Sequence, residues 1–122
     1  DSLVRGTSSR AIIKALRRAG AKRISMLITF PPIKFPCYAG IDFPSQDELA
    51  TYTNSKALTH EETVEKVRSD IGADFLGYND EKTLAEAVGI PLDSMCFTCA
   101  SGNYEPLGIK PEFKTRQEMK GD

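Results

Sequence analysis

In the first thirty residues, apolar positions first recur at helical spacing and then form a continuous run that is typical of a strand. Ser8 or Ser9 is a suitable N-cap, and apolar residues recur from there at helical spacing up to Gly20, so the pattern predicts a helix that ends at this glycine. The inward face of this helix is expected to carry Ile12, Ile13, Leu16 and Ala19. The apolar run over residues 24–30 then predicts a strand that is buried on both faces of a mainly parallel sheet.

A proline-rich segment, residues 31–48, separates this strand from the next helix. Four prolines and a glycine exclude regular structure over most of it, so we expect an ordered loop there. Two residue pairs have capping-box spacing and predict a short helix to about residue 52 and an amphipathic helix to Gly72: Ser45 with Glu48, and Thr59 with Glu62.

One more strand and helix are predicted before an irregular region. The stretch ADFLGY, residues 73–78, favours a short strand, and residues 80–90 favour a helix with Leu84 and Val88 facing inward. Prolines and glycines are frequent after that helix, so an irregular, cysteine-containing segment is expected. Residues 114–122 are polar and are expected to fray.

The order of the first elements predicts the fold class. A loop, a helix and a strand follow one another within thirty residues, which is the second half of a βαβ unit. We therefore expect an α/β fold with a doubly wound, mostly parallel sheet, in one domain, from a longer protein whose leading strand precedes Asp1. Such a sheet would expose an apolar edge, so pairing with a second copy into a homo-oligomer is expected.

Charge and hydropathy exclude several classes of partner. Sixteen basic and seventeen acidic side chains give a net charge of -1, which produces no field that attracts nucleic acid or an anionic membrane. No apolar run approaches the about 20 residues that a membrane span needs, and no signal peptide is recognisable. We expect a cytoplasmic protein that binds neither nucleic acid nor membrane.

The opening stretch, DSLVRGTSS, joins a glycine to three hydroxyl residues where the first helix is predicted to begin. Backbone N–H groups at such a helix start converge on one point, and a phosphate monoester fits there. Asp1 would suit the hydroxyls of a ribose or a bound Mg²⁺. An ordinary helix N-cap preceded by an incidental aspartate explains the same spacing equally well.

Three cysteines form the second candidate site. Cys96 and Cys99 have C-x-x-C spacing, and Cys37 lies in the proline-rich segment, a pattern that favours metal or redox chemistry in a reducing compartment. Three thiolates are an incomplete tetrahedral set, and His60 is expected to be solvated in the first turn of its helix. A thioredoxin-type site fits less well, because it needs a C-x-x-C at a helix start after a strand. Buried, inert thiols are the remaining alternative.

The opening stretch resembles the phosphoribosyl pyrophosphate motif of type I phosphoribosyltransferases, in the form found in the glutamine phosphoribosylpyrophosphate amidotransferase family. The resemblance spans Asp1 to about Pro106. It implies that Asp1 binds Mg²⁺ and that the following residues bind phosphoribosyl pyrophosphate: Asp1, Arg5, Gly6, Thr7, Ser8 and Ser9.

The cysteine segments PPIKFPCYAGID and CFTCASGNYEP are similar to those of the iron–sulfur branch of this family. The similarity implies that Cys37, Cys96 and Cys99 ligate a [4Fe–4S] cluster whose fourth cysteine precedes this chain. Asn103 stands where a lysine is common, and Glu105 separates the tyrosine from the proline, so the path of this turn departs from the family pattern.

This resemblance also implies a domain organisation. Residues 1–113 would be the C-terminal part of a phosphoribosyltransferase domain, with residues 114–122 as a polar tail. Within that part, the phosphate loop would occupy residues 1–9 and the cluster segments residues 31–40 and 94–106.

The family is a glycosyltransferase of the glutamine amidotransferase type, active in purine biosynthesis. It transfers ammonia from glutamine to phosphoribosyl pyrophosphate and produces phosphoribosylamine. No catalytic residue is predicted in this chain, which is expected to be inactive alone. Asp42 is a candidate for the nucleotide or ammonia-transfer region, and a simple turn aspartate is equally consistent with its position.

Two functions of other classes remain open. One is a small iron–sulfur or zinc binding module that needs no partner domain, and the other is a non-catalytic phosphoribosyltransferase homologue that binds nucleotide. The occurrence of three motifs in the order of one enzyme favours the amidotransferase.

Overall fold

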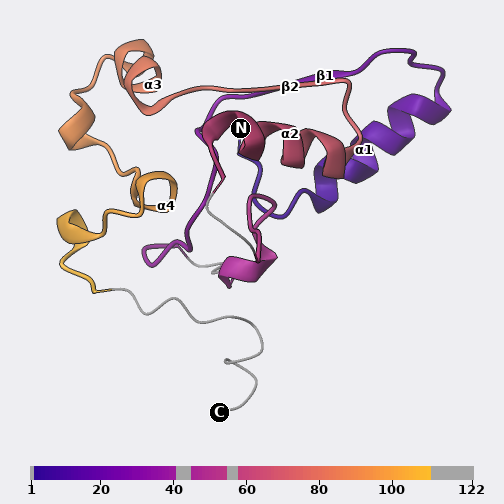
Figure 1. The fold of residues 1–122 in the computed structure, drawn as a ribbon. Helices are drawn as coiled ribbons and strands as arrows, with labels where there is room; N and C mark the ends of the chain where they lie inside the picture. Colours follow the sequence, from indigo (N-terminus) through magenta and orange to yellow (C-terminus); the bar gives the residue numbers. More distant parts are fainter. Residues whose placement is uncertain (1, 41–44, 55–57, 111–122) are drawn as a thin grey trace.

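The computed structural model describes residues 2–40, 45–54 and 58–110 and has two parallel strands with helices on one face (Figure 1). Strand β1, Ser25–Ile28, pairs with β2, Phe75–Tyr78, residue for residue. The expected α/β class with parallel strands is therefore confirmed. Asp1, Asp42 and residues 114–122 lie outside the described residues.

Three longer helices flank the strands. Helix α1, Thr7–Arg18, precedes β1; α2, His60–Ile71, precedes β2; and α3, Glu81–Val88, follows it. The short elements are η1, Gln46–Glu48; η2, Leu92–Ser94; α4, Thr98–Ser101; and η3, Glu105–Leu107. No helix among the described residues is long and apolar enough to cross a membrane.

Helix α2 begins and ends at the residues that the sequence predicts. Thr59 Oγ1 accepts a hydrogen bond from the Glu62 N–H, the Glu62 carboxylate accepts one from the Thr59 N–H, and the helix ends at Gly72 in a left-handed conformation. The expected capping box at Ser45 and Glu48 also forms. The predicted helix to residue 52 is wrong, because the chain becomes extended at Leu49 and the following amide bonds to the Val4 carbonyl instead.

The start of α1 differs from the prediction. Gly6 is the N-cap, with φ +73° and ψ 1°, so neither Ser8 nor Ser9 has that role. This left-handed backbone suits glycine, and it turns the chain into the helix before either serine is reached. A Cβ on Gly6 would lie 3.3 Å from Ile71 Cγ2, which shows how closely the loop approaches α2.

The core lies between one face of the sheet and helices α1 and α2 (Figure 1). Val67, in the middle of α2, has no exposed surface, and it packs in a cluster drawn from both strands and both helices. The buried members of the cluster are Leu3, Ile13, Ile24, Ile28, Ala50, Val67, Ile71, Ala73 and Leu76. Burial of this apolar surface stabilises the α/β arrangement.

The predicted burial of β1 on both faces is wrong. Leu27 is 76% exposed and Phe75, on the neighbouring strand, is 48% exposed, because α1 and α2 cover only the opposite face within the described residues. Two side chains close over Gly77: a Cβ there would lie 3.1 Å from a methyl carbon of Leu27 and 3.3 Å from the ring of Phe75. The outer face of the sheet is thus an apolar patch.

Two helix faces are also narrower than predicted. In α1, Ile13 is buried, but Ile12 and Leu16 are about half exposed, and Ala19 is exposed, because the helix packs against α2 and only Ile13 joins the core cluster. In α3, Ala85 is the buried residue, whereas the outward Val88 contradicts the prediction. Helix α3 packs against η2 rather than against the sheet, which changes the side that it buries.

Candidate functional site

The first candidate site is a cavity of about 250 Å³ formed by residues 2–9. Thr7, Ser8 and Ser9, the first residues of α1, line it together with the preceding loop. Because the N-cap is Gly6, no N-cap side chain occupies the N–H groups of the first turn. The arrangement suits an anion, which would meet backbone donors and the positive end of a twelve-residue helix.

The loop is anchored to the rest of the fold by its own backbone and side chains. The Ala50 N–H donates to the Val4 carbonyl at 2.7 Å, and Leu3 is buried in the core. Arg5 Nη2 lies 3.7 Å from Oε2 of Glu48, the last residue of η1. The structure therefore brings Arg5 and Gly6 to Ser9, all predicted to bind substrate, to one small cavity.

The cysteines form the second candidate site. All three are free thiols: Cys99 lies in α4 and is half-buried, Cys96 precedes α4 and is exposed, and Cys37 is half-buried in the proline-rich segment. The described residues contain no group of three or more His, Cys, Asp or Glu side chains arranged to hold a metal ion. His60 is exposed at the first position of α2, as the sequence predicts.

Electrostatic coupling nevertheless relates the three thiols. Burial raises the pKa of Cys99, and the charges of Cys37 and Cys96 raise it further. Hydrogen bonds from the Thr98 hydroxyl and N–H lower the pKa of Cys96, whose sulfur lies 3.5 Å from the Thr98 Oγ1. The thiol of Cys99 is therefore a weaker acid than an ordinary cysteine, whereas that of Cys96 is a stronger one.

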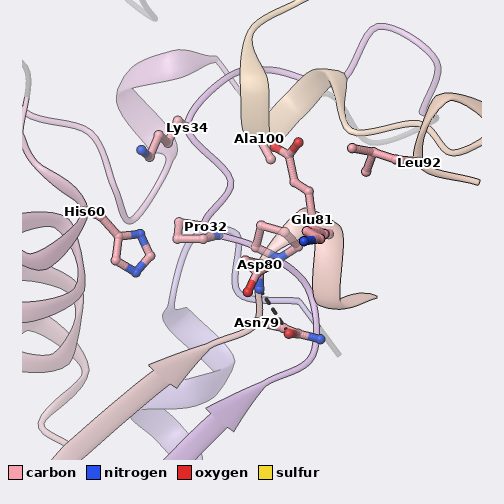
Figure 2. A pocket seen from close by; sticks show the side chains of 10 residues that line it. Pro32, Lys34, His60, Asn79, Asp80, Glu81, Leu92 and Ala100 are labelled. Atoms are coloured by element: carbon pink, nitrogen blue, oxygen red, sulfur yellow. Dashed lines mark hydrogen bonds between the residues drawn. The ribbon is translucent and has the colours of Figure 1, made fainter. Parts of the chain in front are cut away.

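A third cavity, of about 380 Å³, was not predicted (Figure 2). Its lining includes the residues that follow each strand, Pro31 and Pro32 after β1 and Asn79 and Asp80 after β2. In open α/β sheets, ligands bind outside the carboxyl ends of the strands. In the sequence, this cavity could have been predicted from the position of these residues directly after two apolar runs.

Figure 2 shows polar residues around this cavity: Lys34 and His60 approach from one side, and Asp80 and Glu81 lie at the other. The Asp80 carboxylate caps α3, accepting hydrogen bonds from the N–H and hydroxyl of Thr83, and these bonds lower its pKa. Asp80 therefore serves the helix start rather than the open space.

Comparison with known proteins gives relatives over nearly the whole chain. An amidophosphoribosyltransferase from Mycobacterium leprae is 42% identical over 112 residues, which is 92% of this chain and 19% of that protein. One from Methanothermobacter thermautotrophicus is 43% identical over 120 residues, which is 98% of this chain and 23% of that protein. The chain thus spans about a fifth of the length of these relatives. No family model matches the sequence.

Solved structures agree with the sequence relatives. A glutamine phosphoribosylpyrophosphate amidotransferase from B. subtilis, complexed with ADP and GMP, superposes with a TM-score of 0.64 at 34% identity, over 84% of this chain and 22% of that one. A second structure, described as the allosteric regulatory enzyme of purine biosynthesis, has a TM-score of 0.65 at 34% identity, over 85% of this chain and 22% of that one. By sequence and by fold, the chain is therefore homologous to a segment of the amidophosphoribosyltransferases.

Proposed function

We propose that this chain is the phosphoribosyl-pyrophosphate-binding part of an amidophosphoribosyltransferase, which transfers glutamine-derived ammonia to phosphoribosyl pyrophosphate in purine biosynthesis. The observation that carries this proposal is the cavity of residues 2–9 at the start of α1, in a chain about 40% identical to such enzymes. The proposed product is phosphoribosylamine. Because the chain spans about a fifth of its relatives, we propose that it has no activity alone.

The chemistry of the transfer explains what this cavity contributes. Displacement of pyrophosphate builds positive charge on the ribose and negative charge on the leaving group, so substrate positioning and fixed donors lower the barrier. Gly6 to Ser9 would hold the 5'-phosphate through backbone N–H groups, and Arg5 lies beside them. Asp1 remains our proposed Mg²⁺ ligand, and Asp42 our proposed residue of the nucleotide or ammonia-transfer region.

We also propose that Cys37, Cys96 and Cys99 ligate a [4Fe–4S] cluster. The donor set fits in its chemistry, because thiolates are the ligands of such clusters, and the N–H groups of Lys34 and Phe35, in the segment that contains Cys37, donate to the Cys99 carbonyl. It lacks a fourth thiol, which would come from outside this chain. A bound cluster would supply a cross-link between the proline-rich segment and α4.

Two further features support proposals about the location and the assembly of the whole protein. Free thiols are typical of reducing compartments, which supports a cytoplasmic location. The exposed Leu27 and Phe75 support further apolar cover on the outer face of the sheet, and a homo-oligomer is our proposal for the assembled protein.

A segment exchange tests the proposed function. The homologous segment of the M. thermautotrophicus enzyme is replaced by this chain, and ammonia-dependent pyrophosphate release is measured with Mg²⁺ and phosphoribosyl pyrophosphate. We expect release by the exchanged enzyme, none by the chain alone, and a loss of at least tenfold in kcat/KM on Gly6→Val. A folded exchanged enzyme that binds nucleotide but releases no pyrophosphate would support the non-catalytic homologue instead.

Binding to the isolated chain gives a second test. Ribose 5-phosphate is titrated while amide chemical shifts of residues 6–9 are observed. We expect weak binding that moves these signals, because the donors belong to the backbone of α1. Ser101→Ala, at the end of α4, serves as a control that leaves binding unchanged. Binding that shifts other signals only would contradict the assignment of this cavity.

A further inference from the structure

Residues 45–50, which include η1, lie against the loop of residues 2–9, and we call them the loop support. The Ala50 N–H donates to the Val4 carbonyl at 2.7 Å. A Cβ on Gly6 would lie 3.7 Å from the Cβ of Ala50. Val4 and Gly6 are the two neighbours of Arg5, so the loop support approaches the backbone on both sides of this arginine.

Glu48 is the charged residue of the loop support that meets the Arg5 side chain. Its Oε2 lies 3.7 Å from Arg5 Nη2, and it accepts hydrogen bonds from the N–H and the hydroxyl of Ser45, each at 3.2 Å. Ser45 is buried, so these bonds fix the carboxylate to a rigid part of the fold. Glu48 therefore offers Arg5 a partner that is itself held in place.

Arg5 lines the cavity of residues 2–9, together with the first residues of α1. Its carbonyl accepts a hydrogen bond from Arg10 Nη2 at 3.5 Å, which ties the main chain to α1. This bond and the one at Val4 hold the backbone, whereas the ion pair with Glu48 acts on the guanidinium. A guanidinium is the group that pairs with phosphate oxygens.

We infer that Glu48 is a positioning residue that holds the Arg5 guanidinium at the cavity of residues 2–9. This inference rests on the proposed function, and it assigns a role to a side chain that would not itself touch the phosphate. An arginine side chain that is ordered beforehand loses less conformational entropy when the phosphate binds.

Positioning and simple repulsion predict opposite signs. A carboxylate near an anion site repels the anion, so removal of its charge alone would strengthen phosphate binding. If Glu48 instead orders Arg5, removal of the charge weakens binding. The direction of the change therefore decides between the two roles.

Glu48→Gln is the informative variant, because glutamine also fits the capping box. It keeps a side-chain oxygen for the Ser45 N–H and removes the charge that Arg5 meets. Ribose 5-phosphate is titrated into the 122-residue chain and into the variant, and the amide shifts of residues 6–9 are followed. We expect about threefold weaker binding by the variant, which is the size of effect of a partly exposed ion pair.

A double-mutant cycle shows whether Glu48 acts through Arg5. Arg5→Gln alone is expected to weaken ribose 5-phosphate binding about tenfold. Adding Glu48→Gln to Arg5→Gln should then change the affinity little. A further threefold loss in that background would overturn the inference.

Glu65→Gln is the matched control. Glu65 pairs with an arginine, Arg68, at 2.6 Å, but both lie on α2 and neither lines the cavity of residues 2–9. The control removes the same charge from the chain, so unchanged binding is expected. Circular dichroism establishes that each variant is folded.

A measurement without ligand separates this inference from the proposed function. Nitrogen-15 relaxation at Arg5 Nε reports the fast motion of the side chain, which Glu48→Gln should increase and Glu65→Gln should not. Unchanged motion in a folded Glu48→Gln, or tighter ribose 5-phosphate binding by it, would overturn the positioning role. Absence of binding by the unmodified chain, with Arg5 still ordered by Glu48, would overturn the proposed phosphate site instead.

Discussion

Two regions of this molecule are held in place by different interactions. In the core region, residues 3–76, nine buried apolar residues from two strands, two helices and their flanking loops pack into one cluster. The cysteine region, residues 91–110, contributes none of the described members of that cluster. It is attached by hydrogen bonds, by ring contacts such as the stacking of Phe30 on Phe97, with ring centroids 5.7 Å apart, and by the burial of Phe97, Ala100 and Tyr104 outside that cluster.

This difference determines how each region responds to change. Burial of apolar area is non-directional and shared among many side chains, so each buried side chain of the core region contributes to the stability of the whole cluster. Hydrogen bonds and ring contacts are directional and few, so the cysteine region depends on particular residues. A bound ligand would therefore matter more to the second region than to the first.

The largest expected effect comes from the two faces of the sheet in the core region. Leu76→Ala, on the covered face, should lower the free energy of unfolding by about 2–5 kcal/mol, because a buried side chain is replaced by a cavity. Leu27→Ala, on the exposed face, should change it by less than about 0.5 kcal/mol. Urea denaturation of both variants measures the difference. Equal losses would mean that the outer face is covered in solution.

The second prediction concerns the attachment of the cysteine region. Gly102→Ala should cost about 2–4 kcal/mol of local stability, because a left-handed backbone and an overlap with Phe35 act together. Gly108→Ala, also left-handed but with no described atom within 4 Å of its Cβ position, should cost about 1–2 kcal/mol. Hydrogen exchange is expected to show the larger loss in residues 91–110 alone. A matching loss in α2 would contradict the independence of the two regions.

The third prediction concerns the N-cap of α2 in the core region, and its expected effect is smaller. Thr59→Ala should lower the free energy of unfolding by about 1 kcal/mol, because the first turn of α2 loses its N-cap. Thr59→Ser keeps the hydroxyl and should restore most of the stability. Chemical denaturation gives the global value, and alkylation rates of the three thiols report on the cysteine region. Faster alkylation in Thr59→Ala would show that the two regions are coupled.

The smallest effect is a pH dependence in the core region. The Asp74 carboxylate accepts a hydrogen bond from the Ile24 N–H at 2.7 Å and one from Arg17 at 2.5 Å, and these partners lower its pKa. A lowered folded-state pKa gives stability that is present above the ordinary value, about 3.9, and is lost as the pH falls further. Asp74→Asn should therefore have a slightly lower melting temperature at neutral pH.

Melting temperatures at several pH values test the prediction for Asp74→Asn. The difference in melting temperature between Asp74→Asn and the unmodified chain should shrink as the pH falls below about 4. Asp93→Asn, in the exposed η2 turn of the cysteine region, should show no such difference at any pH. A difference for Asp74→Asn that is constant with pH would show that the carboxylate charge is not its cause.

Helices whose ends are marked by capping residues could be predicted from the sequence. The faces that the helices and strands bury could not. Helix α2 follows from the capping box at Thr59 and Glu62, because its donors and acceptors lie within one turn. The exposure of Leu27 and Val88 depends on which elements pack against them, and the sequence contains no local sign of this. At the start of α1, the backbone conformation of Gly6 overrode the preference of serine for the N-cap.

The candidate sites divide in a similar way. The cavity of residues 2–9 was predictable because its lining is a single stretch of sequence, and its binding of a phosphate stays a prediction. The cavity at the ends of β1 and β2 draws its lining from five separate parts of the chain, so only the fold brings them together. The resemblance predicts one site for Cys37 and Cys99, which stays a prediction, whereas the contacts of Tyr104 with Pro36 and Tyr38 could be found only from the structure.

The parallel pairing of β1 with β2 has a consequence for synthesis of the chain. The contact that opens the pairing joins Ile24 to Asp74, fifty positions later. At about 5–20 residues per second, a ribosome needs several seconds to produce β2 after β1 has been made. During that interval, β2 is absent, and α1 and β1 expose apolar side chains that later form the core. This delay is the period in which the nascent chain depends most on protection from aggregation.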